Sequence, residues 1–122
     1  MKTVAVVGAS NRRQKFGNKA IRAFQSAGYT VIPINPHEAV VEGLRAYASV
    51  LDVPDPIDMV TVYVPPAVGI TLLEDFERKQ IGEIWINPGA ESDELMAEAR
   101  RRKLNVIEAC SIIGVGGNPY TP

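Results

Sequence analysis

The stretch TVAVVGASNRRQKFGN, residues 3–18, decides how this chain folds. Its first part is a continuous apolar run rich in valine, which is typical of a β-strand buried on both faces. Gly8 follows this run directly, and a polar loop then leads into a helical pattern. A strand that passes through a glycine turn into a helix is the first unit of an α/β fold.

Strand-like and helix-like segments alternate along the rest of the chain. We expect strands at residues 3–8, 29–34, 44–47, 58–64, 83–86 and 105–108, and helices at residues 18–27, 66–79 and 93–102. Ser92 is the predicted N-cap of the last of these helices, and Gly28 is placed to end the first. Residues 114–122 are expected to be irregular. This alternation predicts a Rossmann-like doubly wound parallel sheet with helices on both faces, three layers in one domain over residues 1–122.

The pattern also predicts which side chains are buried. In the second helix, the residues expected to face the sheet are Val68, Leu72, Leu73 and Phe76. Tyr63 and Trp85 fall within apolar strands and are expected in the core.

Composition limits the partners of the protein. The 122 residues fit a single domain, and the net charge of -1 gives no general attraction to nucleic acid or to an anionic membrane. No apolar run approaches the ~18 residues of a membrane span. A single cysteine, Cys110, excludes an intramolecular disulfide. We therefore expect a cytoplasmic protein in which any anion site is local.

The turn after the first strand departs from the dinucleotide fingerprint GxGxxG. Ser10 and Arg13 stand where the fingerprint requires its second and third glycines, and the next glycine is Gly17. The connection is also longer than the usual βα loop of about two to six residues. It carries three cations, Arg12, Arg13 and Lys15. Cations at the N-terminus of a helix suit a polyphosphate that is held rather than cleaved.

The end of the second strand argues against NAD. NAD-binding proteins place an acidic residue there to hold the ribose hydroxyls, whereas this strand ends at Asn35-Pro36 and the first acid is Glu38. An NADP site would favour an arginine just after Ile34, and the first one available is Arg45. An NAD(P)-binding oxidoreductase or redox sensor is the alternative from a different class.

Four motifs, in this order, resemble a known family. They are VVGAS at residues 6–10, VIPINP at 31–36, VYVPP at 62–66 and WINPGA at 85–90. Together they resemble the small stand-alone CoA-binding proteins, which are similar to the N-terminal CoA-binding domain of the succinyl-CoA synthetase alpha subunit. The resemblance covers about residues 3–110 and implies coenzyme A as the cofactor. These proteins often carry glutamine where this chain has Asn87.

The resemblance implies roles for residues at four strand ends. Those expected at the CoA phosphates, including one at the start of the helix, are Gly8, Ala9, Ser10, Arg12, Arg13, Lys15 and Gly17. Those expected elsewhere along the cofactor are Asn35 and Pro36 beside the adenosine, Val64 and Pro65 in the middle of the cleft, and Asn87, Pro88 and Gly89 towards the pantetheine.

The sequence offers no complete set of catalytic residues. The synthetases work through a phosphorylated histidine in a second domain, and the only histidine here, His37, is expected on a solvated loop. Ser10 lacks a GxSxG elbow and a histidine base. Cys110 is expected to be a small core residue, and no cluster of histidines and cysteines indicates a metal site.

The sequence therefore predicts a module that binds CoA or an acyl-CoA without catalysis of its own, as a carrier, sensor or regulatory module. A further alternative is a subunit of a multi-chain acyl-CoA enzyme. A homodimer and a protein partner both stay open.

Overall fold

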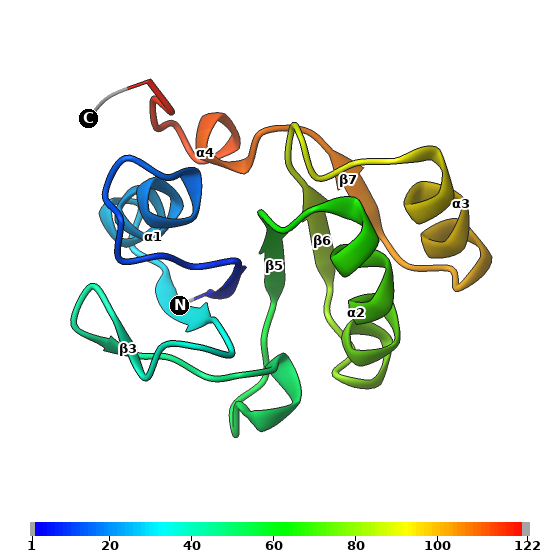
Figure 1. The fold of residues 1–122 in the computed structure, drawn as a ribbon, viewed down its shortest axis with the longest axis horizontal. Coiled ribbons are helices and arrows are strands. Elements are labelled where there is room, and N and C mark those ends of the chain that lie inside the picture. The colour runs from blue at the N-terminus through cyan, green and yellow to red at the C-terminus, as the bar shows by residue number, and fades with distance from the viewer. Residues whose placement is uncertain (1, 121–122) are drawn as a thin grey trace.

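The computed structural model describes residues 2–120 and contains a five-stranded parallel sheet covered by helices on both faces (Figure 1). The strands of this sheet are β1 (Thr3–Val7), β2 (Thr30–Ile34), β5 (Met59–Val62), β6 (Glu83–Ile86) and β7 (Val106–Glu108). Their spatial order is β2-β1-β5-β6-β7, with every neighbouring pair parallel. The predicted doubly wound α/β fold is confirmed. A small antiparallel hairpin lies outside the sheet, formed by β3 (Val40–Val41) and β4 (Leu44–Arg45).

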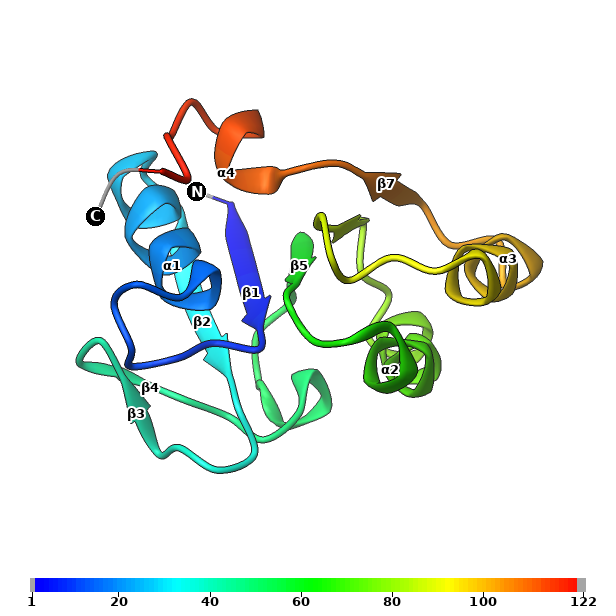
Figure 2. The ribbon, with the colours of Figure 1, turned by 45° about the horizontal axis from the view of Figure 1, so that its top comes forward.

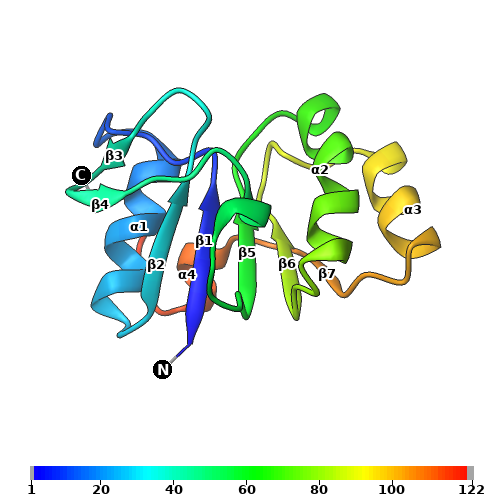
Figure 3. The same cartoon turned by 90° about the horizontal axis from the view of Figure 1, so that it is seen from below.

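Helices form a layer on each side of the sheet, as Figures 2 and 3 show. The helical elements are α1 (Phe16–Ser26), η1 (Val50–Asp52), α2 (Pro66–Arg78), α3 (Asp93–Arg101) and α4 (Ser111–Gly114). Val4 and Val6 pack on the side of α1 and α4, whereas Ala5 and Val7 pack on the side of α2 and α3. Because successive residues of β1 enter two different cores, its sequence is apolar throughout.

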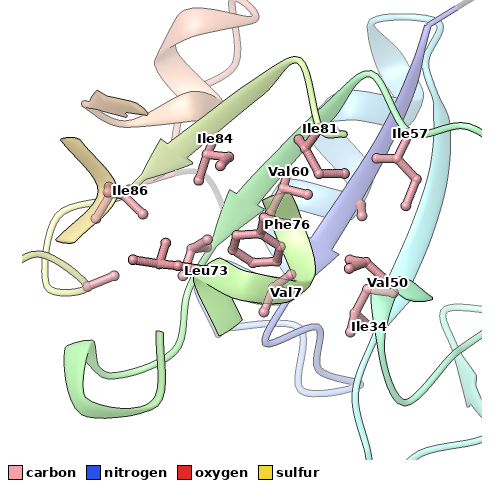
Figure 4. Packing of buried hydrophobic residues seen from close by; sticks show 14 of the residues in the cluster. Val7, Ile34, Val50, Ile57, Val60, Leu73, Phe76, Ile81, Ile84 and Ile86 are labelled. Atoms are coloured by element: carbon pink, nitrogen blue, oxygen red, sulfur yellow. The ribbon is translucent and has the colours of Figure 1, made fainter. Parts of the chain in front are cut away.

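The larger core lies between the sheet and α2 (Figure 4). Phe76 and Leu73 project from α2 onto the strands, where they are packed with Val60 and Ile84. The short helix η1 adds Val50 to the same core. α2 begins at the carboxyl ends of the strands and runs back across the sheet. Its packing therefore holds the N-terminus of the helix at that edge of the sheet.

The prediction that Val68 faces the core is wrong. Its side chain is 45% exposed, whereas Leu73 and Phe76 are buried. The strand that precedes α2 ends at Val62 and not at the predicted residue 64, so Tyr63 and Val64 belong to the turn. The first turn of α2 therefore lies past the carboxyl edge of the sheet, where no strand is available to cover Val68.

The end of the chain is more regular than its sequence indicates. Four residues expected to be loop or tail form α4, and this helix is too short to show a helical period. The predicted N-cap of α3 is confirmed, because the Ser92 hydroxyl accepts a hydrogen bond of 3.1 Å from the Leu95 amide. Among residues 2–120, no helix is long and apolar enough to cross a membrane.

The start of α1 lies directly against the end of β1. A Cβ added at Gly17 would lie 2.1 Å from the carbonyl oxygen of Gly8, which is far inside van der Waals contact. Gly8 itself has a φ of +89°, and a Cβ there would meet the Tyr63 carbonyl carbon at 3.1 Å. Both glycines are therefore required by close backbone approach, and Gly17 serves helix–strand packing.

We expect Gly17→Ala to destabilise the protein by about 1–3 kcal/mol or more, because two backbone segments must separate to admit one methyl group. The measurement is urea unfolding followed by circular dichroism. Gly69→Ala in α2 is the control, because its added Cβ would meet side chains and no backbone: the end of Leu95 at 3.0 Å, and Val62 and Val64 at 3.8 Å. Alanine also favours the helix by about 1 kcal/mol. Equal unfolding midpoints for wild type and Gly17→Ala would contradict the packing role.

Candidate functional site

The carboxyl ends of β1, β5 and β6 open into one cleft of about 650 Å³, which we call the central cleft. The chain passes from β1 to β2 on one side and then crosses to β5 on the other, so the order of strands reverses at this point. Such reversal points are where open α/β sheets bind ligands. The residues that line the central cleft are Gly8, Ala9, Ser10, Gln14, Lys15, Phe16, Gly17, Asn35, Tyr63, Val64, Pro65, Pro88, Gly89 and Ala90.

Backbone amides at the N-terminus of α1 lie at the central cleft without hydrogen-bond acceptors among the residues that the structure describes. The N-cap residue is Lys15, whose side chain makes no capping hydrogen bond. The amides of Ser10, Phe16 and Gly17 have no hydrogen-bond acceptor within residues 2–120. In α3, by contrast, the Ser92 hydroxyl already accepts a hydrogen bond from one of the N-terminal amides, that of Leu95. An uncapped helix N-terminus beside a cleft is suited to bind an anion.

A buried asparagine holds the loop between β1 and α1 in place. The Asn18 amide nitrogen donates to the Ser10 carbonyl at 2.8 Å, and its oxygen accepts from Arg22 Nε at 2.9 Å. The Ser10 hydroxyl accepts from the Arg12 amide at 3.0 Å. Asn18 is fully buried and was not among the predicted site residues. Its role depends on a contact across the turn that the sequence pattern does not reveal.

The three predicted cations have different surroundings. Arg13 forms an ion pair of 2.9 Å with Glu42 in the turn of the β3–β4 hairpin. The neighbouring Asn11 donates to the Val40 carbonyl at 2.9 Å and accepts from the Glu42 amide at 3.1 Å. Arg12 and Lys15 are exposed, and neither side chain has an ion pair within the described part of the chain. The hairpin therefore fixes the loop and leaves two of its cations unneutralised.

Asn35 occupies the place where NAD-binding proteins have an acid. Its amide nitrogen donates to the Ala9 carbonyl at 2.8 Å, and its oxygen accepts from the His37 amide at 2.7 Å. The side chain therefore joins the ends of β1 and β2 and fixes its own turn. His37 is exposed, as predicted.

A second cavity, of about 310 Å³, lies beside this turn under the start of α2, and we call it the α2 cavity. It shares Gly8, Asn35 and Val64 with the central cleft. The remaining residues that line it are Val7, Ile34, Pro36, His37, Ala48, Ser49, Val50, Val68, Leu72, Asp75 and Phe76. Most of this lining is apolar, and it includes Val68, the residue wrongly predicted to face the core.

The end of β6 is fixed by a buried polar network. The Asn87 amide nitrogen donates to Thr61 Oγ1 at 2.6 Å and to the Val62 carbonyl at 3.0 Å, and its oxygen accepts from the Ser111 amide at 2.9 Å. Asn87 is 1% exposed. The Thr61 and Ser111 hydroxyls are 2.7 Å apart. This network joins β5, β6 and the start of α4, and it satisfies the polar atoms of Asn87 within the protein.

Tyr63 lies between the network and the central cleft. Its hydroxyl is 3.0 Å from Ser111 Oγ, and burial raises the pKa of the phenol. Tyr63 therefore stays protonated at neutral pH. The expectation of a core residue holds only in part, because the half-buried ring packs on the α1 side and also lines the cleft. Trp85 is likewise half-buried and packs beneath Gly114.

A third cavity, of about 170 Å³, lies beyond Tyr63 next to α4, and we call it the α4 cavity. Phe16, Tyr63 and Pro88 line both this cavity and the central cleft. Its other lining residues are Asn87, Cys110, Ile112, Ile113, Pro119 and Tyr120. Cys110 is half-buried and packs against the α1-side core, so it is a partly exposed wall residue.

Most predicted site residues come together at this edge. Ten of them line the central cleft: Gly8, Ala9, Ser10, Lys15, Gly17, Asn35, Val64, Pro65, Pro88 and Gly89. Pro36 lines the α2 cavity, Asn87 lines the α4 cavity, and Arg12 and Arg13 stand on the exposed loop. Their contact with a cofactor stays a prediction. Sequence reasoning did not identify Asn18, Phe16 or Tyr63 as site residues, since a local pattern does not show which side chains at a helix start or strand end face the cleft.

The ionisable side chains that line the central cleft are Lys15 and Tyr63. Its lining residues, all within the described chain, include no histidine, aspartate or glutamate. No group of three histidine, cysteine or acidic side chains within residues 2–120 is placed to share a metal ion. The arrangement can hold an anionic group at the helix and apolar groups on either side.

Comparison with known proteins supports the same interpretation. The chain is 31% identical over 121 residues to an ADP-forming acetate–CoA ligase II of Archaeoglobus fulgidus, covering 96% of this chain and 18% of the ligase. It is 32% identical over 114 residues to the alpha subunit of an ADP-forming acetate–CoA ligase II of Pyrococcus furiosus, covering 92% of this chain and 24% of the subunit. The chain thus spans a quarter or less of the length of these relatives.

A solved structure is similar over nearly its whole length. It is a conserved hypothetical protein of Pyrococcus furiosus with 30% identity and a TM-score of 0.85, covering 93% of this chain and 99% of that one. The family model of the CoA binding domain matches residues 2–115. With this match over nearly the whole chain, and with the anion-suited cleft at the strand reversal, the protein belongs to the CoA binding domain family.

Proposed function

We propose that this chain binds coenzyme A or an acyl-CoA across the carboxyl edge of its sheet and holds it without reacting with it. The observation that carries the proposal is the uncapped N-terminus of α1, with the unpaired Arg12 and Lys15 nearby, between two cavities with largely apolar lining. Coenzyme A has a matching division: an adenosine at one end, phosphates in between and a thiol-bearing arm at the other.

The phosphates belong at the start of α1. The amides of Ser10, Phe16 and Gly17 supply donors, and the helix dipole adds a partial positive charge. Arg12 and Lys15 supply charge without first giving up an ion pair, whereas Arg13 is already bound to Glu42. Gly8 and Ala9 shape this turn, and both of their amides donate to the Ile34 carbonyl.

The adenosine belongs in the α2 cavity and the arm belongs along the central cleft. Pro36 and Val68 provide apolar walls for a flat base, and Asn35 keeps the neighbouring turn in place. From the phosphates, Val64 and Pro65 on one side and Pro88 and Gly89 on the other lead to Tyr63 and the α4 cavity. In this assignment, the buried hydrogen bonds of Asn87 hold the end of β6 in place beside the cleft.

The lining of the central cleft favours carriage, sensing or regulation over catalysis within this chain. A cleft lined, within residues 2–120, by no histidine or carboxylate can hold a thioester, but it lacks the side chains that most often serve as a general acid or base. Two relatives are whole ligases or ligase subunits, so assembly with a catalytic partner is a role that fits the same cleft.

We expect CoA and acetyl-CoA to raise the thermal midpoint, whereas NAD(H), NADP(H) and ATP raise it less or not at all. A ligand that binds only the native state at 100 times its Kd stabilises it by about 2.7 kcal/mol. The measurement is differential scanning fluorimetry with each ligand at equal concentration. Stabilisation by NAD(H) without stabilisation by CoA would remove the proposal.

We expect the double variant Arg12→Ala, Lys15→Ala to bind CoA roughly tenfold more weakly, because it loses two charge-assisted contacts. Its affinity should also depend less on salt, since fewer charges are left to screen. Isothermal titration at two salt concentrations measures both effects. Arg100→Ala, which removes an exposed cation from α3, is the matched control and should bind as wild type. An unchanged affinity in the double variant would place the phosphates elsewhere.

A further inference from the structure

The α4 cavity is larger than a thiol end requires and is built from four segments that lie far apart along the chain. Phe16 comes from the start of α1, Tyr63 and Pro88 come from two strand ends, and Ile113 and Tyr120 come from the end of the chain. Figures 1 and 2 show α4 and residues 115–120 lying beside α1. The cavity continues the central cleft through the walls that both share.

The lining of this cavity favours an apolar ligand. The amide of Asn87 is bonded to Thr61, Val62 and Ser111, and the hydroxyl of Tyr63 is bonded to Ser111. Every buried polar side-chain atom in the described chain has a hydrogen-bond partner. A charged group placed here would lose its water and, apart from the hydroxyl of the exposed Tyr120, would find only the weak donor of the Cys110 thiol among the lining side chains, whereas a hydrocarbon would lose nothing.

The mouth of the cavity carries large apolar side chains exposed to solvent. Phe16 is 49% exposed, Ile113 is 59% exposed and Tyr120 is 83% exposed. These are three of the six large hydrophobic residues that stand exposed within residues 2–120, and they gather at this one opening. A hydrocarbon chain that entered past them would bury apolar surface on both partners.

We propose that the α4 cavity receives the acyl chain of an acyl-CoA thioester and selects short unbranched hydrocarbon chains over free CoA and over chains that end in a carboxylate. This inference rests on the proposed function, because the phosphates at α1 must first direct the arm towards Tyr63. It assigns Phe16, Ile113 and Tyr120 to recognition of the acyl group.

Lys19 lies close to the α4 cavity, and a lysine that reached into the cavity would favour a different kind of acyl chain. Lys19 Nζ lies 5.4 Å from the centre of the Phe16 ring and donates to the Pro119 carbonyl at 2.9 Å. It is not among the residues that line the cavity. If Lys19 gave up this bond to reach into the cavity, a carboxylated chain would be preferred, and the test must separate the two cases.

The test is isothermal titration with CoA, acetyl-CoA, butyryl-CoA and succinyl-CoA, of which the last two have the same chain length. We expect butyryl-CoA to bind roughly fifteenfold more tightly than acetyl-CoA, since it adds two methylene groups and each one buried improves affinity about fourfold. Succinyl-CoA should lose that advantage. Ile113→Trp, which fills the mouth, should bind butyryl-CoA and acetyl-CoA equally while its affinity for CoA stays that of wild type.

Leu51→Trp is the matched control, because it adds the same ring at an exposed residue that lines none of the three cavities. It should keep the preference for butyryl-CoA. If CoA binds and butyryl-CoA binds no better, the acyl inference fails while the CoA site stands. If no CoA compound binds, the proposed function itself fails. Tightest binding of succinyl-CoA, or an unchanged preference in Ile113→Trp, would also overturn the inference.

Discussion

The backbone of α1 meets the backbone of β1 at Gly17 and Gly8 with no space for a side chain between them, and the site depends on this contact. It brings the unpaired amides at the start of α1 next to the strand ends. Gly8 is confined on its other side by Tyr63, so three segments converge on two residues that have no Cβ. A side chain at Gly17 would move the helix away from the edge where an anion can be shared by several donors, and one at Gly8 would press against Tyr63 and Val64.

Three asparagines, two of them buried and one partly buried, fix the rest of the edge as these glycines fix the first turn. Asn18, Asn35 and Asn87 each bond to a backbone carbonyl of another segment. Each therefore satisfies a carbonyl at the end of a strand or turn, where no sheet partner is available. Their amides have both a donor and an acceptor, so one side chain can join two segments. The predicted roles of Asn35 and Asn87 as ligand contacts are distinct from these structural bonds.

The polar groups around the cleft are of two kinds. Its charges stand on an exposed loop, and its buried polar atoms are already paired within the protein. Tyr63, the group whose pKa is shifted by burial, is held as a neutral phenol beside Ser111. Groups arranged in this way can orient a ligand and exclude water around an apolar chain.

The sequence alone determined the fold class, because each apolar run, glycine turn and helical stripe is a local pattern with a known period. It also determined the family, and most of the strand-end residues that now line the central cleft. It failed for Val68, because a helical period cannot say where the sheet beneath a helix ends. It missed α4, which is too short to have a period.

Only the tertiary structure decided which cations are unpaired, that Asn18 and Asn87 are buried supports, and that Phe16, Tyr63 and Ile113 share a cavity. Each of these facts depends on contacts between segments far apart along the chain. Such contacts follow from how helices and strands pack together, and a local pattern of residues does not contain them.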